Sequence, residues 1–160
     1  MFRCFEYTAF LWKAKGRHGT HSPFAYWLAD GVAGQKIKQE ISLPIDIKSK
    51  KSRQFISKLS HLLAAYELRH FSQNEENPSK PYIYILGPAQ LHNFEATLPL
   101  HSCHPDTIFV IADPRAKNNK HHWQNICKSQ NLHFTADCYY FGLLSPRPGQ
   151  VKEHFYLKLS

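Results

Sequence analysis

The positions of apolar side chains divide the chain into a helical part and a part in which strands and helices alternate. In the first part, apolar residues recur every three or four positions, which is the spacing of one helix face. Three amphipathic helices are predicted. Their apolar stripes are Phe2, Phe5, Ala9 and Trp12, with Phe10 on the adjoining edge; Phe24, Trp27, Leu28 and Val32 or Gly31; and Phe55, Leu59, Leu62, Leu63 and Tyr66. Gly16 ends the first helix, Thr20 or Ser22 caps the second, and the third is predicted within residues 52–71.

Short, continuous apolar runs begin after a polar, proline-bearing loop. They predict strands at residues 82–86 and 107–112, and amphipathic helices at residues 91–100 and 118–130. Residues 132–144 and 152–160 have the composition of two further strands, and the segment between them contains two prolines and a glycine. We therefore expect the last two strands to form an antiparallel hairpin at the edge of a sheet.

This order of elements predicts an α/β fold with a helical extension at its N-terminal end. Residues 1–71 form the helical region, residues 72–81 a loop, and residues 82–160 a partial α/β region, all within one domain. The strand-helix-strand order implies a right-handed crossover, so the strands at 82–86 and 107–112 should be parallel neighbours. Pro44 makes the segment between the second and third helices irregular or an edge strand.

Composition narrows the class of protein. The chain has 160 residues, of which 42% are hydrophobic and 14% aromatic, as in a globular domain. No apolar run is long enough to span a bilayer. The four cysteines, Cys4, Cys103, Cys127 and Cys138, form no CxxC pair, which favours free thiols in a reducing cytoplasm. A net charge of +8 favours acidic partners, among which nucleic acid is the commonest.

Five quoted segments carry a resemblance to a known family. They are "LWKAKGRHGTHSPFAY", "HNFEATLP", "HPDTIFVIADPR", "HHWQNI" and "TADCYYFGLLSPRPGQVKEHFYLKL". In this order they resemble the N-terminal signature, the helix after the fourth strand, the fifth strand, its following helix and the final hairpin of a class I S-adenosylmethionine-dependent methyltransferase family common in Bacteroidota. The resemblance implies a Rossmann-like sheet made of parallel strands and a C-terminal antiparallel hairpin.

The resemblance also shows what this chain lacks. Such an enzyme holds its cofactor with a glycine-rich turn after the first strand, where the backbone approaches the ligand, and with a carboxylate on the ribose. Residues 72–81 leave room for a loop only, so the cofactor half of the sheet is predicted to be missing. Pro88 and its neighbours stand where the resemblance implies an aspartate, and Ala112-Asp113 replaces an expected pair of aspartates. We therefore expect no cofactor and no methyl transfer.

An alternative alignment to the same family is compatible with an active enzyme. Gly87 would be a degenerate cofactor turn and Asp113 the ribose-binding acid, at a separation of 26 residues against about 20 in dinucleotide-binding folds. Under this alternative the protein is an S-adenosylmethionine-dependent methyltransferase with a degenerate site, or with a site that a second subunit completes. The match of residues 92–99 to the later helix favours the non-catalytic interpretation.

Two histidines are further candidates for chemistry, and Asp113 has a second possible role. His18 and His21 lie in "GRHGTHSPF", where they would act as acid and base or as metal ligands, or where the segment is only a turn between two helices. The turn is favoured because no cysteine or carboxylate lies within a few residues to complete a metal site, and no metal is predicted. Asp113 follows a strand at the position where α/β sheets place functional groups, but it equally suits a cap or turn before Pro114.

Lys48, Lys50, Lys51 and Arg53 form the densest basic run. Such a run binds a phosphate backbone through counterion release, and it also serves as a solvated, solubilising face. The sequence as a whole predicts a cytoplasmic, non-catalytic subunit that is not attached to a membrane. Its expected partner is another protein or a second copy of itself, because an incomplete sheet exposes an edge, and RNA is a further candidate at the basic run.

Overall fold

Six strands form one mixed sheet in the order β1-β2-β3-β5-β4-β6. The computed structural model describes residues 2–14, 22–36, 42–43, 47, 50–64, 66–71, 79–97 and 103–158. The strands are β1 (Glu67–His70), β2 (Tyr82–Leu86), β3 (Ile108–Ala112), β4 (Phe134–Asp137), β5 (Phe141–Ser145) and β6 (Glu153–Tyr156). Only β5 runs against its neighbours β3 and β4, so the other strands all end at the same edge of the sheet.

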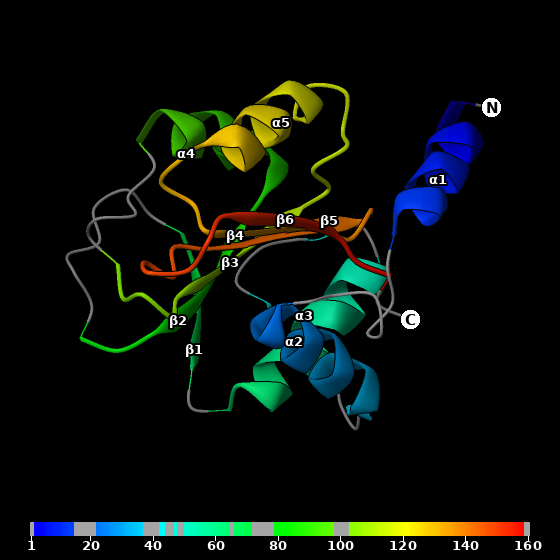
Figure 1. The fold of residues 1–160 in the computed structure, drawn as a ribbon. Helices are drawn as coiled ribbons and strands as arrows, with labels where there is room; N and C mark the ends of the chain where they lie inside the picture. Colours follow the sequence, from blue (N-terminus) through cyan, green and yellow to red (C-terminus); the bar gives the residue numbers. More distant parts are fainter. Residues whose placement is uncertain are drawn as a thin grey trace.

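Helices cover both faces of this sheet (Figure 1). The helices are α1 (Phe2–Lys13), α2 (Pro23–Gly34), α3 (Lys50–Leu62), α4 (Leu91–Thr97) and α5 (Lys120–Lys128), with a 3-10 turn at Pro88–Gln90. Helices α2 and α3 lie on one face, and α4 and α5 lie on the other, whereas α1 stands to the side of both layers. The resulting architecture is an α/β sandwich of three layers.

The core follows from the alternation of side chains along each strand. In β2, Ile83 and Ile85 point to the layer of α2 and α3, while Tyr84 and Leu86 point to the layer of α4 and α5. β3 repeats this pattern, so both of its faces are apolar and buried. Both central strands are therefore continuous apolar runs in the sequence.

Several sequence predictions are confirmed. The strands at 82–86 and 107–112 are parallel neighbours, with Ile83 opposite Ile108. Helices occur at both predicted positions between the later strands. Of the two candidate caps for the second helix, Ser22 fills this role, because its side chain accepts a hydrogen bond from Ala25 N at 3.4 Å and Pro23 begins the helix.

The prediction for the C-terminal hairpin was wrong. Residues 132–144 are not one strand but contain β4 and the start of β5, and these two form the antiparallel pair. The turn between them forms because the Asp137 carboxylate accepts a hydrogen bond from the backbone N–H of Tyr139 at 2.8 Å, and Tyr139 adopts a positive φ of 68°. The last strand, β6, lies on the other side of β4 and runs parallel to it.

The helical region was predicted to extend too far. The third helix ends at Leu62, and Glu67–His70 forms β1, which pairs in parallel with β2. The helix does not continue, because Tyr66 N donates to Leu63 O in a turn and the residues that follow pair with β2 in the sheet. The predicted boundary at residue 71 therefore separates β1 from the sheet to which it belongs.

The buried face of α1 was also predicted wrongly. Phe5 and Trp12 are 78% and 93% exposed, whereas Phe10, on the edge of the predicted stripe, is 4% exposed. Phe10 is buried because Tyr139 and Tyr156 from the sheet edge offer it aromatic partners. In α2, Trp27 was expected to pack on the domain but is 43% exposed. No described helix is long and apolar enough to cross a membrane.

Candidate functional site

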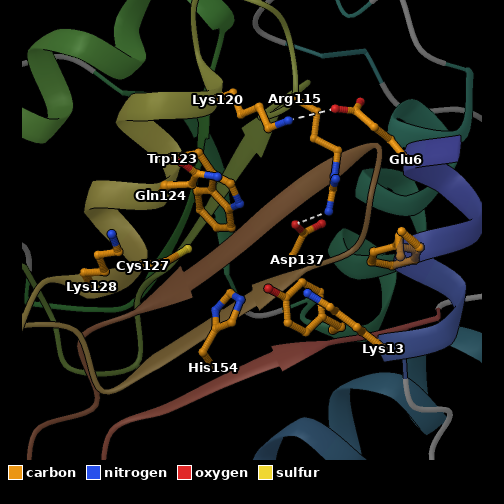
Figure 2. Close-up of a pocket in the computed structure, with 13 residues that line it drawn as sticks. Glu6, Lys13, Arg115, Lys120, Trp123, Gln124, Cys127, Lys128, Asp137 and His154 are labelled. Atoms are coloured by element: carbon orange, nitrogen blue, oxygen red, sulfur yellow. Dashed lines mark hydrogen bonds and ion pairs between the residues drawn. The ribbon is translucent and has the colours of Figure 1, made fainter. Parts of the chain in front are cut away.

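The face of the sheet below α5 changes from apolar to polar at β4 and β6. Thr135 and Asp137 of β4 and His154 and Tyr156 of β6 alternate with residues that belong to the opposite, apolar face. Asp137, His154 and Tyr156 form the floor of a hollow of about 600 Å³, which lies between α1 and α5 (Figure 2). We call it the α1–α5 hollow. It opens at the carboxyl ends of β4 and β6, the edge at which α/β sheets bind ligands.

A buried ion pair organises this edge. Arg115, from the loop after β3, donates to Asp137 Oδ2 at 2.6 Å, and Tyr139 N donates to Asp137 Oδ1 at 2.8 Å. The Asp137 side chain is 6% exposed and that of Arg115 is 20% exposed. Both carboxylate oxygens are therefore bound, and the aspartate serves to hold the guanidinium and the β4–β5 turn in place.

Helix α1 is attached to the edge mainly by rings. The Arg115 guanidinium lies 5.5 Å from the centre of the Phe10 ring and 5.0 Å from that of Tyr139. Tyr7 meets Tyr139 edge to face, with their centroids 4.7 Å apart. Glu6 adds an ion pair with Lys120 of α5 at 2.7 Å. The Arg115–Asp137 pair thus supports the rings on which α1 rests.

Cations outnumber carboxylates around the α1–α5 hollow. Four cations line it: Lys13, Arg115, Lys120 and Lys128. The two carboxylates that line it, Glu6 and Asp137, are both engaged in the ion pairs described above. Lys13 lies over the Tyr156 ring at 5.6 Å, and Lys128 lies on the opposite side of the hollow (Figure 2). The hollow therefore presents a net positive charge beside aromatic surface, which suits an anion.

Neither titratable group with a shifted pKa at the hollow is set up as a nucleophile. Burial raises the pKa of the Cys127 thiol to about 12, so the thiolate is scarce at neutral pH. His154 meets Thr135 Oγ1 at 2.8 Å through Nδ1. The residue is exposed at the sheet edge, but desolvation by the groups packed around the ring lowers its pKa, so the neutral imidazole is favoured at neutral pH. The arrangement is suited to binding an anion rather than to attacking one.

A second hollow of about 220 Å³ lies beside the first, and Phe10 lines both. We call it the α1–α3 hollow. Its charged lining is entirely basic, with Lys51 and Lys58 from α3 and Lys158 from the end of the chain. Lys51 lies over the Tyr140 ring at 4.7 Å. The two hollows meet at Phe10 of α1, and each combines basic and aromatic lining residues.

This surface includes only part of the basic run predicted from sequence. Lys51 lines the α1–α3 hollow, and Lys50 is exposed at the start of α3. Arg53 instead donates to Ile47 O at 2.6 Å, which fixes the chain before the helix. Lys48 lies outside the described residues. Lys58 is a lining residue that was not predicted from the sequence, although its spacing of two helical turns from Lys51 places both on one face of α3.

The proposed degenerate cofactor pair lies elsewhere. Gly87 follows β2, and its backbone N–H donates to the Gln90 side chain at 2.8 Å. Asp113 follows β3 with a positive φ of 49°, and its N–H donates to Tyr140 O. A hollow of about 590 Å³ beyond these strands is lined by the following loops, and neither Gly87 nor Asp113 lines it. The backbone around Asp113 is that of a turn before Pro114.

The remaining candidates fall into two groups. His18 and His21 lie outside the described residues, as does the turn between α1 and α2. The other cysteines with described side chains, Cys103 and Cys138, have pKa values raised by burial, to about 11 for Cys103 and well above its usual value for Cys138. Among the described residues, no group of three or more potential ligands is placed to hold a metal ion.

The fold and this surface define a class: an α/β protein with a mixed six-stranded sheet and a basic, aromatic site at the carboxyl ends of its strands. Comparisons with protein-family models, with curated proteins and with solved structures find no match to the chain.

Proposed function

We propose that this protein is a non-catalytic binding subunit whose ligand is single-stranded RNA, held along the two hollows around α1. The proposal keeps the expected loss of methyl transfer and selects RNA over a protein as the partner. The observation that carries it is the charge of the surface. Seven cations line the two hollows, and the two carboxylates among the lining residues are already paired.

The chemistry of a single strand matches this surface. Its phosphates bind Lys and Arg, while its unpaired bases stack on aromatic rings without requiring a fixed sequence. Tyr139, Tyr140 and Tyr156 are partly exposed, and each lies beneath or beside a cation. Each hollow thus offers rings and cations together, as a strand with alternating bases and phosphates requires.

In this proposal, the scaffold that carries the RNA-binding surface is a reduced form of the methyltransferase sheet that the sequence resembles. The order of strands and helices from β2 to β5, with a hairpin after β3, supports a reduced methyltransferase-like sheet. At the carboxyl end of β2, the Gly87 N–H is bound by Gln90, whose side-chain amide in turn donates to Phe71 O. These bonds tie β2 to the end of β1 and use the backbone donor that a cofactor turn would offer.

Fluorescence anisotropy with labelled RNA tests the proposal. The protein should bind a single strand more tightly than a duplex, with little dependence on sequence. If the protein binds about four phosphates, the slope of log K against log salt should be near −3. The double variant Lys51→Glu with Lys58→Glu should bind at least about tenfold more weakly, and the slope should become shallower by about 0.7 for each phosphate that the variant no longer binds.

Lys80→Glu is the matched control. Lys80 is exposed before β2, at the edge opposite the two hollows, and the substitution reverses the charge of one lysine, as each of the two substitutions in the double variant does. Its RNA affinity should stay near that of the unchanged protein. Equal losses in both proteins, or no binding at low salt, would refute the proposal. Saturable binding of S-adenosylmethionine at micromolar concentration, abolished in Asp113→Ala, would instead favour the active enzyme.

A further inference from the structure

We infer that the α1–α5 hollow contains a phosphate subsite at Lys120 and Arg115, and that Glu6 occupies this subsite when no ligand is bound. The inference deepens the proposed function and rests on it for the source of the phosphate. It concerns one ion pair in particular. Glu6 Oε1 of α1 lies 2.7 Å from Lys120 Nζ of α5, across the mouth of the hollow (Figure 2).

The two carboxylates at the hollow are held very differently. Asp137 is almost fully buried and has both oxygens bound, so its replacement by a ligand would leave Arg115 and the β4–β5 turn without support. Glu6 and Lys120 have side chains that are 38% and 49% exposed. Ion pairs this exposed are weak and are screened by salt. A ligand can therefore displace Glu6 while Asp137 stays in place.

The groups around Glu6 favour a phosphate over a carboxylate. Arg115 lines the hollow with a side chain that is 20% exposed, and among the described residues its buried Nε–H has no hydrogen-bond partner. The guanidinium therefore has donor capacity that Asp137 does not use. Lys13 and Lys128 line the same hollow, and within the described residues neither forms an ion pair with a carboxylate. A phosphate has more oxygens and at least as much negative charge as Glu6, so it satisfies more of these donors at once.

Helix α1 remains docked in this scheme. Its attachment through Phe10 and Tyr7 is aromatic and does not depend on the Glu6 carboxylate. The Glu6 side chain turns away from Lys120 when the ligand binds. The carboxylate thus lowers the affinity of the empty subsite for anions and gives an advantage to ligands that carry a full phosphate over weakly charged ones.

Calorimetry with inorganic phosphate and with adenosine monophosphate tests the subsite directly. Glu6→Gln removes the competing charge and should tighten binding of both ligands about three- to tenfold. Lys120→Gln should weaken binding by a similar factor. Glu67→Gln is the control, because Glu67 also pairs with nearby cations but lies on β1, away from the hollow. It should leave phosphate affinity unchanged, and thermal melts should show all three variants folded.

Binding of chloride, measured in the same variants, distinguishes a specific phosphate subsite from a general effect of charge. If Glu6→Gln tightens chloride as much as phosphate, or tightens neither, the inference is wrong. RNA binding provides the second arm, since a backbone phosphate in the subsite should make RNA affinity follow the same order of variants. RNA binding that responds to Lys51→Glu with Lys58→Glu but ignores Glu6→Gln refutes the subsite and leaves the proposed function intact. Phosphate binding that follows this order of variants, without any RNA binding, supports the subsite and refutes the proposed function.

Discussion

Replacing Asp137 by alanine should be among the most damaging single changes at the carboxyl edge of the sheet. The substitution removes the acceptor of two hydrogen bonds, from Arg115 at 2.6 Å and from Tyr139 N at 2.8 Å. Removing one partner of a buried ion pair costs about 3–5 kcal/mol, because the other charge stays behind without compensation. Arg115 keeps 20% of its side-chain exposure, and water therefore recovers part of this cost.

We expect a loss of about 3 kcal/mol in the free energy of unfolding. For a chain of this size that corresponds to a Tm lower by roughly 6–12 °C. Urea and thermal unfolding followed by circular dichroism measure both quantities. Glu67→Ala is the comparison, since Glu67 forms ion pairs with Arg69 and Lys80 at the surface, and its removal should leave the Tm essentially unchanged.

The companion variant Arg115→Met tests the cause. If the uncompensated charge is responsible, the double variant Asp137→Ala with Arg115→Met should be less destabilised than the sum of the two single variants. Strict additivity would mean that the two side chains do not stabilise each other. If Asp137→Ala and Glu67→Ala have the same Tm, the Arg115–Asp137 ion pair does not stabilise the carboxyl edge of the sheet.

Three further outcomes are expected. Gly142→Ala should destabilise the fold by about 1–3 kcal/mol, because a Cβ would lie 2.5 Å from the Trp123 ring. An unchanged midpoint in urea titrations would contradict this close packing. The pKa of His154 is lowered below 6.5, so the unfolded chain takes up this proton more readily and stability should fall as the pH drops below about 6.5; His154→Gln should reduce that fall in melts across the range. Burial raises the pKa of Cys138 well above its usual value, so peptide mapping after iodoacetamide treatment should find it unmodified in the folded protein and modified in urea.

The sequence by itself determined the elements whose signals are local or continuous. The strands β2 and β3 are apolar along their whole length because both faces are covered, and a buried strand of this kind needs no knowledge of its neighbours to be recognised. The start of α2 was readable for a similar reason, since Ser22 and Pro23 act on the first turn alone. The basic character of the chain was equally plain.

Only the tertiary structure decided which segments pair and which faces are buried. Residues 67–70 carry no strand signal stronger than the helix before them, and they become β1 because β2 offers an unpaired edge. Helix α1 buries Phe10 rather than its broader apolar stripe, because the rings it meets come from the β4–β5 turn and β6, far along the chain. The candidate site has the same origin. In the sequence, Arg115 and Lys120 are only two of several basic residues after β3, and Asp137 carries no distinguishing signal. They become a site because β5 pairs with both β3 and β4, which brings the end of β4 within reach of the loop after β3, below α5 and α1.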